Sequence, residues 1–586
     1  MTDYNKYAAD DTLIMKAKVK AAAFIKDETQ FHLGFLPTEQ SHPYTRNLSS
    51  VIQRDTKEGL KLIFDVDRDL PPVARRIFLS EPFENLCLAF EEAARFNRRV
   101  CFTGCGSTGR LSMMLEEMWR QFWEDRDGVN PGDSVRVSVK NENQNKADLA
   151  CSIMTGGDRA LIRSVENFED YEAFGARQVQ DLHLQAKDLL IAISEGGETS
   201  SVLGTLREGQ RRQCTVFLAF NNPASILRSK LDRCKRVLDA DDVTVLDLYT
   251  GSMALSGSTR MQATTMEMLI IGAAMEIGLQ KAVSGPEDSI RVDPLEYADG
   301  FALLIKDLCS PSCLDGMAQW AEAEESIYRK GGRLTYLATS YLLDIFSDTS
   351  ERSPTFMVPP FRAGDDRTSP VSWAFAKDPA RPSDEAWIHM LRRRPRGLNW
   401  TKQDYQDMNA PEYAGKNPPV LDAVEISRYS IGNEKDLSRR EKDPFLYLHV
   451  FVDQLADLKD SVPSHKTLHI GTPLSGHNAD ISVPLSLSES PISLWQHLAV
   501  KLIFNGVSTG TMAMMGRIRQ NWMIQLDPTN KKLIDRGSRI VSQLLGISYE
   551  DACVELHVSL LARERFLAKG GQTILSPVEA VLQRRG

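Results

Sequence analysis

The sequence has no apolar run approaching the roughly 20 residues that a membrane-spanning helix needs. Its first residues, MTDYNKYAADD, are polar and acidic and do not resemble a secretory signal. The net charge of -9 gives no reason, at the level of the whole chain, to expect nucleic acid or an anionic membrane as a partner. We therefore expect a cytoplasmic protein that binds neither nucleic acid nor membrane.

Metal-binding patterns are also missing. The ten histidines form no H-E-x-x-H or similar spacing, and the nine cysteines are dispersed along the chain. Dispersed cysteines are typical of reduced thiols in a cytoplasm. We expect no structural metal and no cofactor.

The composition is that of a globular protein, with 42% hydrophobic and 25% charged residues. A chain of 586 residues is too long for one ordinary domain, so we expect roughly two to four. Three apolar runs alternate with helical stretches in the first half: VCFTG (100–104), DLLIAIS (188–194) and CTVFLAF (214–220). Such runs are typical of parallel strands covered on both faces, and the alternation predicts an α/β doubly wound sheet.

The same pattern restarts near residue 290. A helical segment around 298–328 leads to further expected strands at 333–339, 445–452 and 466–471. From about residue 490 to the end the sequence predicts helices only. The α/β layout therefore occurs twice and is followed by a helical cap.

A basic run, RRRPRG (392–397), lies in a stretch rich in Pro, Arg and Asp. Such a run can bind phosphate or nucleic acid, but more often it is a solvated surface. The acidic balance of the chain favours the solvated surface.

A glycine turn, TGCGSTGRLS (103–112), follows the first expected strand and precedes a helix-like run. Unpaired N–H groups and the helix dipole at such a helix start favour an anion, and Ser107 and Thr108 add hydroxyl donors. A plain turn with one of these hydroxyls as the N-cap explains the turn equally well. The turn also spells G-x-G-x-x-G, a weak dinucleotide signal, with Gly104, Gly106 and Gly109.

Two further turns change this balance. ISEGGETSSVLG (193–204) and LSGSTRMQATTMEMLI (255–270) both bring hydroxyls and glycines to a helix start. A dinucleotide site would instead need an acidic residue after the second strand to hold the ribose. Three such turns predict one pocket for a small phosphorylated, hydroxyl-rich ligand, to which the second and third turns contribute Ser194, Gly196, Glu198, Thr199 and Ser258.

The chain resembles the sugar isomerase (SIS) family, and within it the glucokinase regulatory proteins and the N-acetylmuramic acid 6-phosphate etherases. The matching stretches occur in the family's order: TEQSHPYTRNL (38–48), GCGSTGRL (104–111), TGGDRALIRSVENFED (155–170), SGSTRM (256–261) and the 501–533 stretch that begins KLIFNGVSTG. The resemblance implies flavodoxin-like SIS domains. It also implies that sugar phosphate is bound by Gly106, Ser107, Thr108, Glu169, Ser194, Gly196 and Lys501.

The size and the repeated layout resemble the regulatory proteins, which have two SIS domains and a helical lid. We accordingly expect an N-terminal segment (1–50) that packs on the SIS domains. A first SIS domain with the ligand site (51–290), a second with a degenerate site (291–500) and a helical lid (501–586) should follow. The second domain's turn, ATSYLLD (338–344), has no glycine, so we expect this domain to serve as scaffold.

Catalysis of the etherase kind would need a base and an acid. The resemblance places Glu169 at the position of the family's base. Met118 occupies the position of its acid, and the neighbouring Glu117 is a weak substitute because one residue rotates a helical side chain by about 100°.

Three hypotheses follow. The first is a regulator that senses a ketose or amino-sugar phosphate and acts on a partner protein, such as a sugar kinase. The second is a lyase or isomerase on such a sugar, and the third, ranked well below, is a dinucleotide-dependent enzyme. The missing acid favours the first over the second, while Glu169 keeps the second open.

Overall fold

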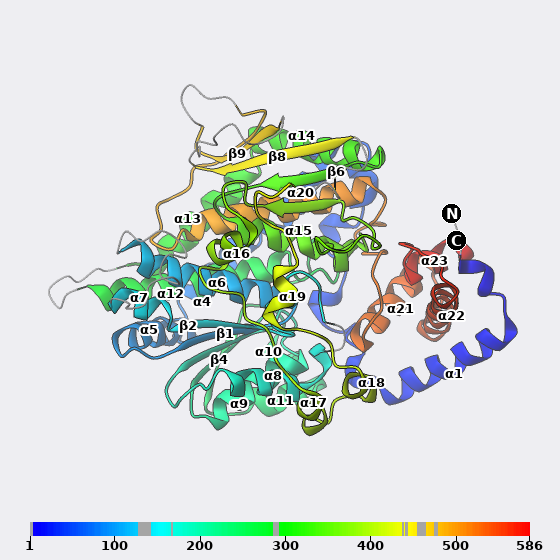
Figure 1. Cartoon of the computed structure of the whole chain (residues 1–586), viewed down its shortest axis with the longest axis horizontal. Coiled ribbons are helices and arrows are strands. Elements are labelled where there is room, and N and C mark those ends of the chain that lie inside the picture. Colours follow the sequence, from blue (N-terminus) through cyan, green and yellow to red (C-terminus); the bar gives the residue numbers. More distant parts are fainter. Residues whose placement is uncertain are drawn as a thin grey trace.

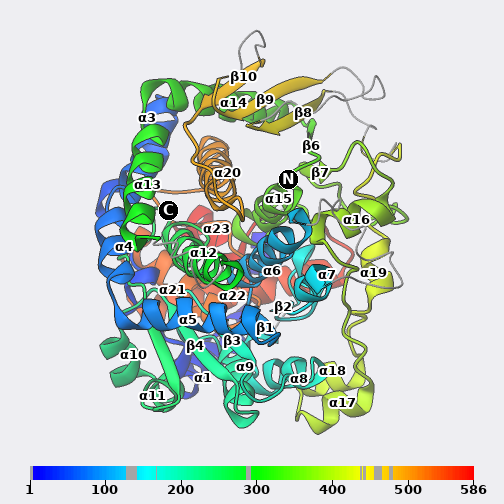
Figure 2. The same ribbon diagram turned by 90° about the vertical axis from the view of Figure 1, so that its left-hand side faces the viewer.

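The computed structural model describes residues 4–126, 142–165, 168–284, 292–435, 439, 444–453, 465–473 and 479–586. Two five-stranded sheets, all of whose paired strands run parallel, organise the chain. They lie on opposite sides of a shared layer of helices (Figures 1 and 2). Within the described residues no helix is both long and apolar enough to cross a membrane.

The first sheet has the strand order β2-β1-β3-β4-β5, which is that of flavodoxin-like doubly wound folds. Val100 pairs with Ala150 on one side and with Leu189 on the other, so the strand that precedes the glycine turn is an inner strand of the sheet. The strands are β1 (Val100–Gly104), β2 (Ala150–Met154), β3 (Leu189–Ile193), β4 (Thr215–Phe220) and β5 (Val243–Asp247).

The second sheet repeats this topology. Its order is β10-β9-β8-β6-β7, so its strands, taken in chain order, again run second, first, third, fourth, fifth. They are β6 (Arg333–Leu337), β7 (Ala374–Lys377), β8 (Phe445–Val452), β9 (Lys466–Gly471) and β10 (Ile481–Pro484). The expected fold class, two flavodoxin-like α/β units with helices at the C-terminus, is confirmed.

Helices cover both faces of the first sheet. On one face, α9 packs against β3 and β4, and on the other, α5 and α6 pack against the strands and against α12. The helices of this half are α2 (Leu48–Ile52), α3 (Thr56–Asp67), α4 (Leu70–Phe78), α5 (Glu81–Arg95), α6 (Ser107–Asp125), α7 (Glu142–Ala147), α8 (Glu172–Asp181), α9 (Ser200–Arg211), α10 (Ala224–Lys230), α11 (Asp232–Leu238) and α12 (Gln262–Val283).

The segment expected to be helical around 298–328 consists of two helices, because Ser310 caps a new helix whose first residue is Pro311. The helices of this half are α13 (Pro294–Leu308), α14 (Pro311–Arg329), α15 (Leu342–Phe356), α16 (Ser383–Leu391), α17 (Lys402–Asp407), α18 (Glu412–Lys416), α19 (Ala423–Ser427) and α20 (Leu494–Met514).

The helix α20 runs through the middle of the molecule, in contact with α3, α12, α14 and α15 (Figure 2). Nearly all of its residues are buried, and a helix that is apolar on every side belongs in a core. The expected lid boundary at residue 501 therefore falls inside a core helix.

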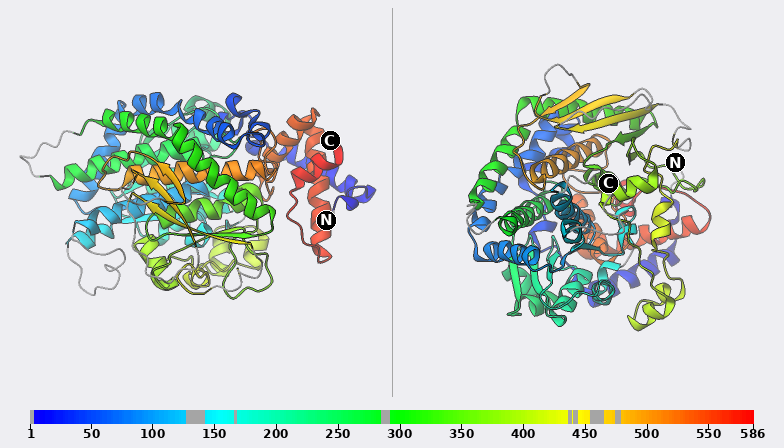
Figure 3. Two further views of the ribbon diagram at one scale, coloured as in Figure 1. Left: turned by 90° about the horizontal axis from the view of Figure 1, so that it is seen from above. Right: turned by 60° about the vertical axis from the view of Figure 1, so that its left-hand side comes forward.

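Three later helices stand apart at one end of the molecule, α21 (Lys531–Leu545), α22 (Tyr549–Ala568) and α23 (Pro577–Arg585) (Figures 1 and 3). The first helix of the chain, α1 (Asp11–Asp27), packs against α22, and the Tyr4 hydroxyl donates to the Leu575 carbonyl at 3.3 Å. The N-terminal segment thus begins on these C-terminal helices, and further along the Thr38 N–H donates to the Asn222 side chain of the first α/β unit at 3.2 Å. We call α21–α23 the lid.

The basic run at 392–397 is not a solvated surface. Arg393 lies 5% exposed and pairs with Asp158 at 2.5 Å and with Glu116 at 2.9 Å. Arg392 pairs with Glu124 at 2.9 Å. Net charge could not indicate this, because the acidic partners come from the first α/β unit more than 200 residues earlier. The run joins the two halves of the molecule.

We predict that Arg393→Ala lowers the free energy of unfolding by about 3–5 kcal/mol, because it leaves the buried Asp158 carboxylate without its cation. Arg394→Ala is the matched control, since that side chain is exposed and surface substitutions usually cost less than about 0.5 kcal/mol. Chemical denaturation measures both. Equal effects of the two substitutions would contradict a structural role for the run.

Candidate functional site

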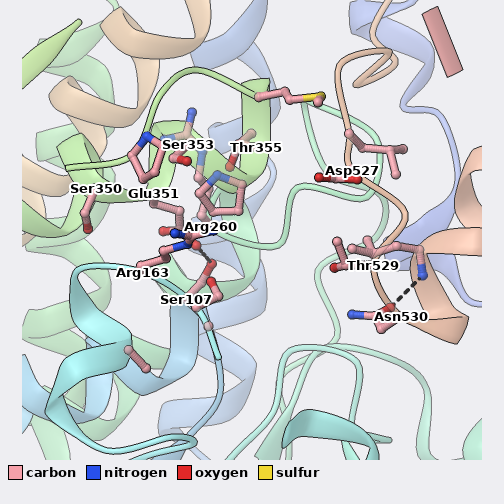
Figure 4. A pocket seen from close by; sticks show the side chains of 18 of the residues that line it. Ser107, Arg163, Arg260, Ser350, Glu351, Ser353, Thr355, Asp527, Thr529 and Asn530 are labelled. Carbon is pink, nitrogen blue, oxygen red and sulfur yellow. Dashed lines mark hydrogen bonds between the residues drawn. The ribbon is translucent and has the colours of Figure 1, made fainter. Parts of the chain in front are cut away.

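A cavity of about 450 Å³ lies where the first sheet, the second α/β unit and the lid meet (Figure 4). Its wall includes the turn that follows β1, the turn that follows β3 and the 257–260 segment. The second unit contributes α15, and the lid contributes the start of α21. The volume is typical of a small-molecule site.

The glycine turn between β1 and α6 needs its glycines. A Cβ on Gly104 would lie 2.3 Å from the Thr108 carbonyl carbon, and Gly106 has a φ of +57°. Gly106 and Ser107, two of the residues predicted to bind ligand, line the cavity. Thr108 does not, because its hydroxyl accepts from the Cys105 N–H at 3.0 Å and donates to the Cys105 carbonyl at 2.9 Å. Thr108 holds the turn.

Positive charge lies beside this turn. Arg110 is buried and donates to the carbonyls of Gly106 and Leu161, each at 3.2 Å. Burial lowers the pKa of this guanidinium. Arg163 is exposed and faces the cavity near Ser107 (Figure 4). With the N–H groups at the start of α6, these side chains favour an anion.

The turn after β3 brings Thr199 to the wall. The other residues of this turn that were predicted to bind ligand are bonded to protein groups instead. The Ser194 hydroxyl lies 3.0 Å from that of Thr199, and the Gly196 carbonyl accepts from Asn222 at 3.1 Å. Glu198 is buried in two ion pairs, with Arg233 at 2.8 Å and with Lys532 at 2.9 Å.

Ser258 of the 257–260 segment, another residue predicted to bind ligand, lies on the wall. Lys501 of α20 is not among the residues that line the cavity. The Lys501 ammonium donates to the carbonyls of Arg260 at 3.0 Å and Met261 at 3.2 Å. Burial lowers its pKa to about 8. In the described structure Lys501 stabilises the backbone at residues 260 and 261, because its N–H groups donate to carbonyls there and not to the cavity.

Glu169 lies on the cavity wall, where the prediction of a base would place it. Its carboxylate accepts from the Asn530 amide at 2.5 Å and lies 3.6 Å from the Cys105 sulfur. Asn530 is also the N-cap of α21, accepting from the Leu533 N–H at 2.8 Å. One amide therefore joins the lid to the first sheet.

Glu117 does not reach the cavity. Its carboxylate pairs with Arg392 at 2.6 Å and lies 3.5 Å from His497, on the face of α6 toward the second unit. Met118, at the position of the family's acid, is fully buried in the core. Neither residue could act on a ligand in this cavity.

Comparison with known proteins connects this geometry to a family. The family model described as "Glucokinase regulatory protein N-terminal SIS domain" matches residues 85–210, which contain β1, β2, β3 and most of α9. Residues 85–210 are therefore similar to a SIS domain. This matched part of the chain carries two of the three turns that line the cavity.

Curated relatives cover a wider part of the chain. The N-acetylmuramic acid 6-phosphate etherase of Photorhabdus laumondii is 26% identical over 244 residues, which are 41% of this chain and 68% of the relative. The etherase of Yersinia pestis is 28% identical over 251 residues, or 42% of this chain and 73% of the relative.

Several wall residues were not predicted. Asn530 and Lys532 lie inside the 501–533 stretch that carries the family resemblance, and Glu195 lies inside the second turn, so a signal was present for these three. No sequence signal indicated Glu351 on α15, because this residue comes from the unit that was expected to be only scaffold. It accepts a hydrogen bond from Ser107 (Figure 4). The second unit is therefore part of the site.

We predict that Gly104→Ala destabilises the fold more than Gly106→Ala. The first Cβ would overlap backbone of α6, whereas the second meets nothing within 4 Å and costs only the strain of its positive φ, about 1–3 kcal/mol. Denaturant unfolding of the two variants compares them. A Gly104→Ala protein as stable as the unmodified chain would contradict the close approach at this turn.

Proposed function

We propose that this chain binds a phosphorylated sugar in the cavity and, in response, regulates a partner protein. The observation that carries the proposal is the meeting of three parts of the chain on one cavity, with an anion-favouring helix start at its base. The match to the regulatory protein's SIS domain supports the same conclusion.

In this proposal the phosphate lies at the start of α6, where N–H groups, Ser107 and the charge of Arg110 are available. The sugar then extends toward Glu169 and Thr199. Glu351 of the second unit accepts a hydrogen bond from Ser107, and Asn530 of the lid donates one to Glu169. A ligand that contacts Ser107 and Glu169 would therefore also contact Glu351 and Asn530 or replace their hydrogen bonds.

A ligand at this junction would alter how the lid and the second unit are held against the first sheet. A ligand shifts a conformational equilibrium by as much as its affinity differs between the two states. When three parts of the chain contact one ligand, a shift of one part changes the affinity for that ligand. Such a difference in affinity between two conformations is what a sensor requires. The partner we propose is a protein, such as a sugar kinase.

The second candidate function is a lyase of the etherase kind. The etherase relatives and the position of Glu169 on the wall favour it. Against it, Glu117 is paired away from the cavity and Met118 supplies no acid. We therefore rank sensing above turnover.

We predict that fructose 6-phosphate binds and that Ser107→Ala weakens it roughly tenfold or more, because a donor to the phosphate is lost. Isothermal titration calorimetry measures both affinities. Ser312→Ala, an exposed serine on α14 away from the cavity, is the control and should bind as the unmodified chain does. Equal affinities of the Ser107 and Ser312 variants would contradict the proposed phosphate position.

We predict that N-acetylmuramic acid 6-phosphate binds without release of D-lactate, because Met118 stands at the position of the family's acid and Glu117 lies outside the cavity. An enzymatic lactate assay after incubation decides this. Lactate that disappears in Glu169→Gln would make the chain an etherase and contradict the sensor. Lactate lost in a folded Glu117→Gln variant would further contradict the position assigned to that side chain.

A further inference from the structure

The cavity wall carries four carboxyl groups within the described part of the chain, and three of them have a donor of their own. These pairs are Glu169 with Asn530, Asp527 with Arg563, and Glu351 with Ser107. The fourth is Glu195, in the turn after β3. Its residue is only 7% exposed, and it belongs to none of these pairs.

The surroundings of Glu195 disfavour a negative charge. Burial acts most strongly, and the Glu351 carboxylate on α15 acts in the same direction. Hydrogen bonds from the backbone and from Thr259 in the 257–260 segment act in the opposite direction. Burial and like charges both favour the protonated form of a carboxyl group.

The cation that acts on Glu195 is Lys532, which already pairs with another carboxylate. Lys532 of α21 lies 2.9 Å from the carboxylate of Glu198, which shares it. Cys105 also lines the cavity, and burial and the charge of Glu169 hold the pKa of its thiol well above the ordinary value. It offers no compensating charge. The same environment raises the pKa of Glu195 to about 7, chiefly through burial.

We propose that Glu195 carries a proton when the sugar phosphate binds, and that it donates this proton in a hydrogen bond to an oxygen of the sugar. Glu169, whose carboxylate oxygen already accepts from the Asn530 amide, accepts from a hydroxyl of the sugar. The two carboxyl groups thus recognise an acceptor and a donor on one ligand. This inference rests on the proposed sugar-phosphate site and adds its specificity residue.

The sign of the pH dependence follows. If the ligand binds the protonated form of Glu195, affinity is complete below pH about 7 and falls about tenfold for each pH unit above it. Ionisation of the ligand's own phosphate, with a pKa near 6, acts in the opposite direction. A variant that is neutral at every pH separates the two effects.

Glu195→Gln provides that variant, because its amide keeps a donor and never ionises. We expect fructose 6-phosphate to bind both proteins about equally near pH 6. The ratio of the two Kd values, unmodified over variant, should rise about tenfold per pH unit above about 7 in calorimetry. Glu169→Gln should weaken binding and keep the pH dependence of the unmodified chain. A ratio that stays constant from pH 6 to pH 9 would overturn the proposal.

A ligand-free measurement separates this inference from the proposed function. Difference infrared spectroscopy detects the C=O stretch of protonated carboxyl groups, and one band titrating near pH 7 should be absent from Glu195→Gln. Asp170, whose pKa burial also raises to about 7, should contribute a band to both proteins. If no band is lost, Glu195 is ionised and the inference fails. If the band is lost but fructose 6-phosphate binds at no pH, the proposed function fails instead.

Discussion

The hydrogen bond between Asn530 and Glu169 is the constraint on which the site depends. It joins the first turn of the lid to a loop of the first sheet, and the cavity lies between them. A second attachment supports it, because Arg536 and Arg539 of α21 both bind the buried carboxylate of Glu39, at 2.6 and 2.8 Å. These cations hold the pKa of Glu39 far below its usual range. The lid is thus held by an amide hydrogen bond and by buried ion pairs at the edge of the cavity.

The central strands and the twofold repeat were predictable from sequence. The apolar runs at 100–104, 445–452 and 466–471 coincide with β1, β8 and β9. The strands that sequence reasoning missed are β2, β5, β7 and β10, which are the outer strands of the two sheets. They have only four or five residues each, and runs this short are hard to distinguish from a loop or a helix segment by apolar periodicity alone. β1 and β3 are equally short, but each leads into a turn rich in glycine and hydroxyl residues that marks its end.

The site was predictable in part, and the limit is physical. Glycine turns before helices locate the cavity, because their geometry is local. Whether a polar side chain faces the ligand or the protein depends on partners far away in sequence. Lys501 faces backbone carbonyls, and Glu198 faces two cations. Glu351 faces the cavity from a different unit. No local pattern carries this information.

The account rests on a phosphorylated sugar binding where the first sheet, the second unit and the lid meet. A crystal structure of the chain with fructose 6-phosphate tests this most directly. We predict phosphate density at the start of α6 beside Ser107, with the sugar between Glu195 and Glu169. Phosphate bound elsewhere, with Glu351 still on Ser107 and Asn530 still on Glu169, would contradict the account.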